Sequence, residues 1–516
     1  MAVVAAHELE VVSPATLEVV ARVPCTPPEN LPALVAASRR AHARWRETPP
    51  SDRAVVLRAA AAALLERADE VADTVVAETG KPRVEAFTSE LFPSLDALGW
   101  LARHAHRALA PQRVALRRPH LLHKRAWIRY DPLGVVGVIS PWNFPFAIPF
   151  TQIAFALAAG NAVVLKPSEL TPLSGALVAD VFAAAGAPDG LVAVAQGGGD
   201  VGSALVGAGV DKVVFTGSAE AGRAVAAAAG ERLVPVTLEL GGNDAMVVLE
   251  DADLDRAVAG ALWASFSNCG QVCAGVERIL VESSLYEPFV EELGRRARGL
   301  RLGVDVGPLV SAEQRARVAA LVEDAVERGG RVVCGGRAPE RRGWWYEPTV
   351  LADVPPDARV ELEETFGPVV TVRRVAGEDA AVAAANGVEQ ALGASVWTRD
   401  AERAARVGRR LRAGAVWHND HAYSYAAAQA PWGGRGASGF GRTHSTHGLY
   451  ELTSPTFVDR DRGNVTPPWW FPYDEGAATA FSAAARVLYA PRLAQRAAQA
   501  WRSRSELVEL ARRSVR

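Results

Sequence analysis

The chain has 516 residues, of which 49% are hydrophobic, so it can build two or three domains with large cores. Its formal net charge of -2 gives no global attraction to nucleic acid, and we expect no nucleic-acid partner. The four cysteines, Cys25, Cys269, Cys273 and Cys334, lack zinc-type spacing and suit a reducing cytoplasm, so no metal site is expected.

No secretory signal is recognisable at the start of the chain, because a basic segment followed by a long apolar core is missing there. The most apolar long window, 145–165, is interrupted by Pro149 and Gly160. It therefore predicts a buried helix followed by a strand rather than a membrane span. These features together favour a cytoplasmic protein.

The first third of the chain predicts an edge hairpin followed by helices. Weak alternation over 8–30 indicates the hairpin. The helical pattern over 31–67 is punctuated by Pro49-Pro50, and the next helix, 69–79, should stop at Gly80. A further helix is predicted from about 84 to 106, and a solvated strand pair within 113–130.

From Gly134 onward the chain alternates between apolar strands and helices. The expected strands are 135–139, 162–165, 191–195, 212–215, 234–237, 278–281, 331–334, 349–354, 394–397 and 415–419. The expected helices are 150–159, 171–184, 286–299, 312–328 and 378–385, with one more after each turn at 197–200 and 216–222. Such alternation is typical of parallel α/β sheets, which bind ligands at the carboxyl ends of their strands.

The end of the chain has a different composition. Aromatic residues lie between prolines at 467–473, and the segment after Gly476 is rich in alanine and arginine. Apolar residues recur there at helical spacing, with a break at Pro491. A basic amphipathic helix can lie on an anionic membrane surface, while the alternative is a helix that docks on its own protein or on a subunit.

Two residues predict covalent chemistry. Cys273 follows a short turn of small residues, and Glu239 lies on a tight turn after a strand. A thiol is a weak nucleophile until it is deprotonated or activated, and a nearby carboxylate can do this. The alternative is that Cys273 is a buried structural cysteine.

Several separated motifs, in one order, resemble the aldehyde dehydrogenase superfamily over nearly all of residues 10–460. They are Pro141-Trp142-Asn143-Phe144-Pro145, Lys166-Pro167-Ser168-Glu169, Phe215-Thr216-Gly217-Ser218, Glu239-Leu240-Gly241-Gly242, Gly270-Gln271-Val272-Cys273, Glu364-Thr365-Phe366-Gly367-Pro368 and Pro431-Trp432-Gly433-Gly434. The resemblance implies an α/β fold with a Rossmann-type cofactor domain, an α/β catalytic domain and a small β oligomerisation arm. It also implies an NAD(P)-dependent aldehyde dehydrogenase.

By this resemblance Cys273 is the nucleophile, which forms a thiohemiacetal and then a thioester. Glu239 is the general base for deacylation. Asn143 and the backbone N–H of Cys273 stabilise the oxyanion, and losing one such donor typically costs about 3 kcal/mol in the barrier.

The resemblance also assigns the cofactor site. Glu169 would accept a hydrogen bond from a ribose hydroxyl and repel a 2′-phosphate, which favours NAD and leaves NADP as a second candidate. Gly217 and Ser218 would meet the pyrophosphate at a helix N-terminus. The full set of cofactor residues is Ile139, Ser140, Pro141, Trp142, Asn143, Lys166, Ser168, Glu169, Phe215, Gly217, Ser218, Ala221, Gly222, Leu240, Gly241, Glu364 and Phe366.

Three features depart from the common family pattern. Gln152 stands where many members carry a lysine proposed for proton relay, and Val272 replaces a frequent Cys or Thr. Asn243-Asp244-Ala245-Met246 follows the double glycine, where many members have Lys or Asn and then Pro. With the aromatic tail, these features resemble the branch that includes carotenoid-dialdehyde and other apolar-aldehyde dehydrogenases.

The substrate is therefore expected to be a small-molecule aldehyde of apolar aliphatic or aromatic type. The aromatic and aliphatic residues Phe146, Ile148, Phe150, Trp263 and Phe266 are candidates for an apolar tunnel, and no arginine is evident for a carboxylate near Cys273. Three alternatives stay open: a succinate-semialdehyde-type dehydrogenase, an acyl-CoA-forming enzyme and a non-catalytic scaffold on a membrane or partner. Glu239 argues against the second, and the intact catalytic set argues against the third.

The resemblance also divides the chain. Residues 1–114 and 133–240 are assigned to the cofactor-binding domain and 241–443 to the catalytic domain. The strands near 115–132 and 444–459 form the oligomerisation arm, so a homodimer or homotetramer is expected. Residues 460–516 are a basic, aromatic extension, the candidate for peripheral membrane contact.

Overall fold

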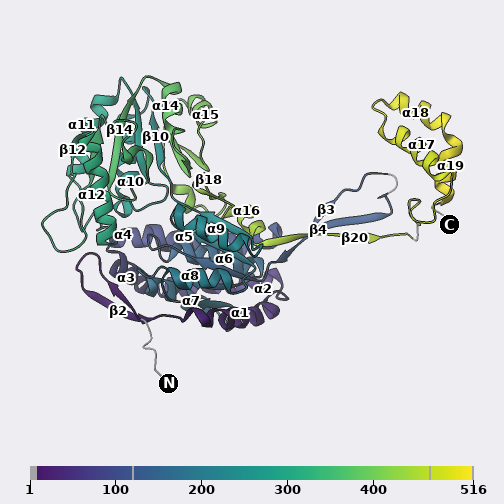
Figure 1. Ribbon diagram of the computed structural model, residues 1–516, viewed down its shortest axis with the longest axis horizontal. Helices are drawn as coiled ribbons and strands as arrows, with labels where there is room; N and C mark the ends of the chain where they lie inside the picture. The colour runs from purple at the N-terminus through teal and green to yellow at the C-terminus, as the bar shows by residue number, and fades with distance from the viewer. Residues whose placement is uncertain (1–7, 119–120, 464–465, 514–516) are drawn as a thin grey trace. The chain divides into compact units, whose positions relative to one another are not determined.

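The computed structural model describes residues 8–118, 121–463 and 466–513 (Figure 1). The chain divides into two compact units. Unit 1 comprises Met1–Leu109 and Pro132–Ser454, and unit 2 comprises Ala110–Asp131 and Pro455–Arg516. The predicted catalytic domain falls within unit 1, and so does the predicted cofactor domain except for residues 110–114, which belong to unit 2.

The first sheet of unit 1 has six strands in the order β19-β9-β8-β5-β6-β7, and only β19 pairs in the antiparallel sense. Its strands are β5 (Val135–Ile139), β6 (Ala162–Lys166), β7 (Val192–Val194), β8 (Lys212–Thr216), β9 (Val236–Glu239) and β19 (Gly439–Phe440). Strands β5 and β6 are buried along their whole length, as expected for short apolar strands in a sheet covered on both faces.

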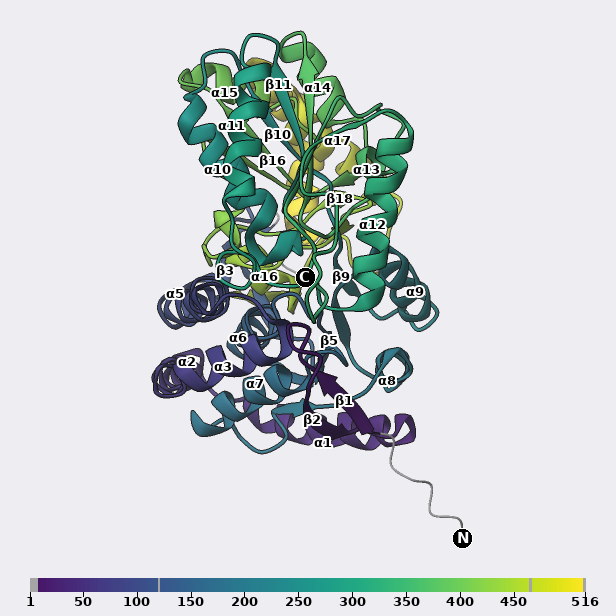
Figure 2. The ribbon, with the colours of Figure 1, turned by 90° about the vertical axis from the view of Figure 1, so that its left-hand side faces the viewer.

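Helices cover both faces of this sheet, with α2, α3, α6 and α7 on one side of β5 and α8 and α9 on the other (Figure 2). The helices are α1 (Leu31–Trp45), α2 (Pro50–Glu66), α3 (Ala68–Thr79), α4 (Arg83–Glu85), α5 (Phe92–Ala108), α6 (Ala147–Ala159), α7 (Pro172–Ala184), α8 (Gly199–Gly207), α9 (Ala219–Gly230) and α16 (Ser445–Glu451). The 3-10 turn η1 (Pro28–Asn30) and the hairpin of β1 (Glu8–Val12) and β2 (Val19–Pro24) precede α1. The hairpin, the break before Pro50 and the end of α3 at left-handed Gly80 confirm the predictions.

The single helix predicted over 84–106 is wrong in one respect. A π-helical segment, η2 (Ala86–Leu91), separates α4 from α5. This wider turn contains Glu90, whose carboxylate is fully buried against the site described below. Its hydrogen-bond partners are distant in sequence, so the helical pattern alone could not reveal the irregularity.

The second sheet of unit 1 has seven strands in the order β12-β13-β14-β11-β10-β16-β17, parallel except for β12. Its strands are β10 (Asp244–Val248), β11 (Val276–Glu282), β12 (Arg331–Cys334), β13 (Thr349–Ala352), β14 (Val369–Val375), β16 (Gly393–Trp397) and β17 (Ala415–His418). Its other elements are α10 (Leu254–Phe266), η4 (Ser267–Gly270), α11 (Tyr286–Arg298), α12 (Ala312–Glu327), α13 (Arg359–Leu362), α14 (Glu378–Ala385), β15 (Gln390–Ala391), α15 (Ala401–Gly408), η5 (Tyr423–Tyr425) and β18 (Arg435–Gly436). The central strand β10 was not predicted, because only Asn243 separates it from the double glycine.

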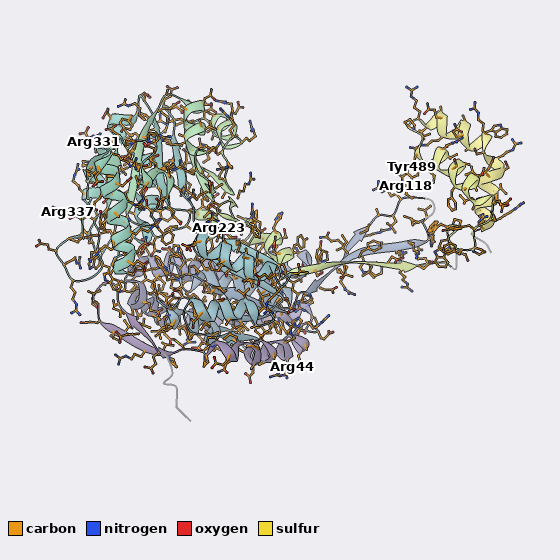
Figure 3. All side chains as sticks on the ribbon, in the orientation of Figure 1. Arg44, Arg118, Arg223, Arg331, Arg337 and Tyr489 are labelled. Atoms are coloured by element: carbon orange, nitrogen blue, oxygen red, sulfur yellow. The ribbon has the colours of Figure 1, made fainter. Side chains whose placement is uncertain are left out.

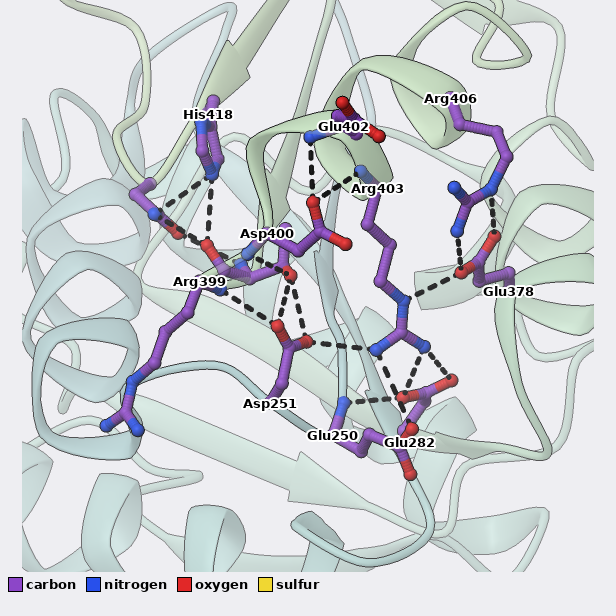
Figure 4. Close-up of polar contacts among 12 residues, drawn as sticks. Glu250, Asp251, Glu282, Glu378, Arg399, Asp400, Glu402, Arg403, Arg406 and His418 are labelled. Atoms are coloured by element: carbon purple, nitrogen blue, oxygen red, sulfur yellow. Dashed lines mark hydrogen bonds and ion pairs between the residues drawn. The ribbon is translucent and has the colours of Figure 1, made fainter.

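A half-buried arginine ties the carboxyl ends of β10 and β11 to helices α14 and α15 (Figure 4). Arg403 on α15 donates to Glu378 at 2.7 Å, to Asp251 at 2.9 Å and to Glu282 at 3.2 Å. Its side chain is only 15% exposed. One guanidinium therefore neutralises carboxylates from three separate segments.

Unit 2 contains a three-stranded sheet in the order β20-β4-β3, formed by β3 (Gln112–Val114), β4 (Lys124–Pro132) and β20 (Thr453–Asp461). Lys124 pairs with Asp459 at 3.0 Å and with Asp461 at 3.2 Å. The strand expected over 444–459 begins only at Thr453, because Ser445–Glu451 forms helix α16.

The extension in unit 2 folds into three helices, α17 (Ala477–Tyr489), α18 (Leu493–Arg502) and α19 (Arg504–Arg513), and α17 packs on the other two. The break at Pro491 is as predicted. Arg118 stacks over Tyr489 with 4.7 Å to the ring centroid (Figure 3). Among the helices that the structure describes, none has both the length and the apolar character needed to cross a membrane.

Candidate active site

A cavity of about 480 Å³ lies where β8 and β9 end, and segments that adjoin each of the two large sheets of unit 1 line it. Eleven of the predicted site residues line it. They are Pro141, Trp142, Asn143, Gly217, Ser218, Glu239, Leu240, Gly241, Cys273, Glu364 and Phe366. Segments separated by more than 200 residues therefore converge on one space, at the sheet edge that the topology predicts.

The nucleophile candidate follows a turn of three left-handed residues. Asn268, Cys269 and Gly270 have φ values of 50°, 57° and 68°. A Cβ on Gly270 would lie 2.0 Å from the carbonyl oxygen of Gly367, so this position requires glycine. Left-handed backbone is unfavourable for residues with a side chain, and its persistence here indicates that the surroundings hold the turn in place.

Side chains that surround the turn supply this support. The Asn268 amide donates to the carbonyl oxygen of Asn143 at 3.0 Å. The Gln271 amide donates to Asn268 O at 3.1 Å and accepts from the N–H of Val310 at 2.8 Å. The turn is thus fixed to the Asn143 loop on one side and to a distant loop on the other.

A second support lies just after the nucleophile. The Nε2 atom of buried His421 is 2.8 Å from the carbonyl oxygen of Ala274, and its Nδ1 atom is 3.1 Å from Ser395 Oγ. Burial lowers the pKa of His421 to about 4, so the ring is neutral at pH 7 and Nε2 carries the proton that it donates to Ala274. This residue was not among the predicted site residues.

Glu239 is the last residue of β9 rather than part of the turn that follows it. Neither carboxyl oxygen has a hydrogen-bond partner among the residues that the structure describes. Burial raises the pKa of Glu239 well above its usual value, with Arg442 opposing this rise and Glu451 adding to it. An unpartnered buried carboxyl beside a cavity can accept a proton from a group that enters there.

Cys273 is partly accessible from the cavity although protein surrounds its sulfur. Burial raises the pKa of this thiol, and the carboxyls of Glu364 and Glu239 raise it further. The free thiol is therefore protonated at neutral pH and needs a base to become a nucleophile.

A buried ion pair holds the Asn143 loop. The ammonium of Lys81 donates to Glu90 at 2.7 Å and to the carbonyl oxygen of Asn143 at 2.8 Å. The other Glu90 oxygen accepts from the N–H groups of Phe146 and Ala147, at the start of α6. The Asn143 amide donates to Gln271 O at 3.1 Å, which leaves its second N–H for a group in the cavity.

A second cavity, of about 260 Å³, reaches Cys273 from another direction. It is lined by Thr88, Ser89, Pro93, Phe144, Ile148, Trp263, Ala264, Ser267, Val272, Cys273, Ala274, Ala422, Tyr423, Tyr425, Ala426 and Trp432. Within the described chain, this lining contains no arginine, lysine or carboxylate. Of the residues proposed for an apolar tunnel, Ile148 and Trp263 line this cavity, whereas Phe146, Phe150 and Phe266 are fully buried in the core and do not.

The cofactor side of the larger cavity is built around the start of α9. Ser218 caps this helix by accepting from the Ala221 N–H at 3.2 Å. A Cβ on Gly241 would lie 2.0 Å from Glu364, whose carboxylate accepts from the Gly242 N–H at 3.1 Å. The ring of Phe366 packs edge-on against Trp142, with 5.4 Å between ring centroids.

The described lining of this cavity does not include the other predicted cofactor residues: Ile139, Ser140, Lys166, Ser168, Glu169, Phe215, Ala221 and Gly222. Ile139 pairs with Lys166 and with Phe215 across neighbouring strands, so three of these positions share one sheet edge. The ammonium of Lys166 lies 3.0 Å from Glu169. A cofactor role for these eight residues stays a prediction.

Several residues that line the larger cavity were not predicted: Thr216, Ala219, Glu220, Gln314, Arg317, Leu362, Glu363 and Gln390. Thr216 belongs to the motif Phe215-Thr216-Gly217-Ser218, so the sequence could have indicated it as a site residue. Gln314 and Arg317 carry no motif, and they position the Glu364 loop by donating to Phe366 O at 2.8 Å and to Glu364 O at 2.9 Å. Only their place on α12, beside that loop, reveals them.

Gln152, one of the departures, lines a small cavity together with Glu239 and Cys273. Its amide donates to Thr216 at 2.9 Å, and the cavity has a volume of about 20 Å³. A neutral amide therefore lies beside the thiol and the carboxyl.

Comparison with known proteins identifies the family of this chain. The model of the Aldehyde dehydrogenase family matches residues 3–458, and the chain belongs to this family, a class of NAD(P)-dependent enzymes. The expected superfamily, fold class and enzyme class are thereby confirmed.

Individual relatives cover most of the chain. It is 38% identical to 4,4'-diapolycopene aldehyde oxidase of Methylomonas sp, over 90% of this chain and 88% of the relative. It is also 38% identical to betaine aldehyde dehydrogenase of Cereibacter sphaeroides (strain KD131 / KCTC 12085), over 89% and 95%. The crystal structure of Mycobacterium tuberculosis aldehyde dehydrogenase complexed with NAD+ is similar with a TM-score of 0.84 and 35% identity, over 88% of this chain and 95% of that chain.

Proposed function

We propose that this protein oxidises an apolar aliphatic or aromatic aldehyde to the carboxylic acid with NAD, as a cytoplasmic enzyme. One observation carries the proposal: Cys273 and the unpartnered carboxyl of Glu239 line one cavity, while a second, uncharged cavity leads to the same sulfur. The first arrangement fits acyl chemistry on a thiol, and the second fits a substrate without charge.

In this proposal Glu239 removes the proton of Cys273, directly or through water, and the thiolate attacks the carbonyl carbon. The oxyanion of the resulting thiohemiacetal accepts from the Asn143 amide and from the backbone N–H of Cys273. After Glu239 has released this first proton to solvent, it removes a proton from the water that hydrolyses the thioester on Cys273. The fixed position of the nucleophile turn and the Asn143 loop keeps these donors in place during both steps.

The cavity that faces Cys273 has features suited to NAD, which when bound supplies the hydride acceptor. The Ser218-capped start of α9 offers backbone N–H groups to a pyrophosphate. Gly217 and Gly241 permit close approach at this wall, and Glu364 and Phe366 line the same cavity as Cys273. Glu169 is the ground for preferring NAD to NADP.

The substrate assignment rests on the lining of the second cavity. An aldehyde with a carboxylate tail would lose the hydration of that carboxylate in this cavity without gaining a cationic partner, which is unfavourable. Trp263 and Tyr425, by contrast, offer large apolar surfaces. The similarity to a relative named 4,4'-diapolycopene aldehyde oxidase supports an apolar substrate.

The test is NADH formation by the purified protein with NAD and decanal, with succinate semialdehyde as the competing substrate. We expect the higher kcat/KM for decanal, and we expect Cys273→Ala to lower kcat by about a thousandfold or more. Cys269→Ala, which removes the buried neighbouring thiol, is the matched control and should retain activity. A higher kcat/KM for succinate semialdehyde would overturn the substrate class, and turnover by Cys273→Ala would overturn the mechanism.

A further inference from the structure

Helix α18 exposes apolar side chains that a helix in a soluble bundle normally buries. Leu493, Ala497 and Trp501 lie at spacings of four residues on one side of the helix, and the exposed fractions of Leu493 and Trp501 are 80% and 72%. The helix buries none of its residues, although α17 packs against it. The bundle core is instead formed by small residues of α17, including Ala480 and Ala484.

Arginines border this apolar strip. Arg492 and Arg496 lie on one flank of α18, and the guanidinium of Arg504 stacks over the Trp501 ring at 5.1 Å. Within the described chain, these three arginines have no carboxylate within ion-pair distance. We define the "α18 face" as Leu493, Ala497 and Trp501 with Arg492, Arg496 and Arg504.

The extension is also strongly basic. Residues 477–513 contain seven arginines and two glutamates, while the whole chain has a formal net charge of -2. The family match ends at residue 458, so these helices are not part of the enzyme fold that the relatives share. Their charge and exposed surface therefore need a separate explanation.

We propose that the α18 face binds the surface of an anionic lipid bilayer. A helix with an apolar strip and flanking arginines can insert its apolar side chains below the headgroups while the cations contact lipid phosphates. Nucleic acid would satisfy the arginines but leave Leu493 and Trp501 in water. A flat bilayer also needs no complementary groove, and the face is a convex helix surface.

This binding would place an enzyme for apolar aldehydes at the phase in which such substrates dissolve. The inference adds a location to the proposed function, but the binding itself requires neither NAD nor aldehyde. An experiment can therefore contradict the membrane binding without contradicting the proposed dehydrogenase activity, and the reverse.

The experiment is co-sedimentation of the full-length protein with vesicles of phosphatidylcholine alone or with about one-third phosphatidylglycerol. We expect at least tenfold stronger partitioning to the anionic vesicles, and weaker partitioning at high salt. Leu493→Ser with Trp501→Ser, and separately Arg492→Gln with Arg496→Gln and Arg504→Gln, should each lower partitioning at least tenfold.

Matched controls come from unit 1. Leu65→Ser removes a leucine that is 61% exposed on α2, and Arg40→Gln with Arg44→Gln and Arg58→Gln removes three exposed arginines of α1 and α2. Neither control should change partitioning, and all variants should retain decanal turnover. Circular dichroism and light scattering show whether each variant is folded.

Equal partitioning of the wild type and both α18 variants would overturn the proposal, as would the absence of wild-type binding. A lower oligomer mass in the α18 variants, with no effect on vesicle binding, would assign the face to contacts between copies of the chain instead.

Discussion

At the scale of single residues, the site depends on two groups whose surroundings disfavour their charged forms. Burial raises the pKa of both Cys273 and Glu239, so neither is ionised as readily as in water. Their proximity in one cavity allows one proton to be shared between them. The activity should therefore depend on pH through this pair rather than through either residue alone.

The pH dependence has a definite sign. A raised pKa means that Glu239 takes up a proton at a higher pH than an ordinary glutamate, so the base is lost as the pH falls through that value. We expect kcat to fall on the acid side, at a pH clearly above the usual glutamate pKa of about 4.3. Glu239→Gln should lower kcat by about 100- to 1000-fold and abolish the fall of kcat on the acid side of the pH profile.

Steady-state kinetics with decanal between pH 5 and 9 would measure the effect. Glu231→Gln, which changes an exposed glutamate at the end of α9, serves as the control and should leave the profile unchanged. An unchanged acid limb and kcat in Glu239→Gln would show that another group is the base.

At the scale of elements, charged side chains fix the loops and helices around the site. The pair of Lys81 and Glu90 links the π-helical segment η2 to the start of α6 and to the Asn143 loop. Arg403 likewise links the carboxyl ends of β10 and β11, by donating to Asp251 and Glu282. In both cases one group satisfies several segments, so its loss would leave more than one partner unsatisfied.

The Arg403 network gives a prediction for stability. Arg403→Met keeps most of the apolar stem but leaves Glu282, whose side chain is 9% exposed, without its cation. We expect the free energy of unfolding to fall by about 2 kcal/mol, because an unpaired buried carboxylate is costly. The denaturant midpoint compared with wild type would measure this change.

Arg410→Met is the matched control, because Arg410 pairs at the surface with Asp379, whose side chain is 91% exposed. Exposed pairs of this kind contribute at most about 1 kcal/mol. Equal midpoints for the two variants would contradict the assigned role of the Arg403 network.

At the scale of the whole molecule, the sheet of β20, β4 and β3 is the predicted site of oligomer formation. Its outer strand β20 exposes Phe457, with 58% of the residue accessible. Aromatic side chains are enriched in protein–protein interfaces, so Phe457 on the predicted arm is a candidate contact between copies of the chain. We therefore expect the purified protein to have two or four times the chain mass of 54.7 kDa.

Light scattering tests this prediction, and Phe457→Ser should shift the mass towards that of the single chain. Phe440→Ser changes a phenylalanine that is 52% exposed on β19 of unit 1 and should have no effect on mass. A single-chain mass for the wild type would refute the oligomer.

Local sequence patterns predicted most of the architecture and named the candidate catalytic residues. Apolar strands and amphipathic helices are local patterns, and a motif such as Gly270-Gln271-Val272-Cys273 is read within a few residues. For the same reason the helix ends at Gly80 and Gly160 follow from local backbone geometry.

What surrounds those residues depends on the tertiary packing and could not be predicted from local patterns. Phe146, Phe150 and Phe266 are as apolar as Trp263, yet they fill the core, while Trp263 and Tyr425 line the second cavity. Lys81, Glu90, Gln314 and His421 support the site through contacts with residues far away in the chain. Burial and long-range contacts depend on how the elements pack, and no local pattern of residue types specifies that packing.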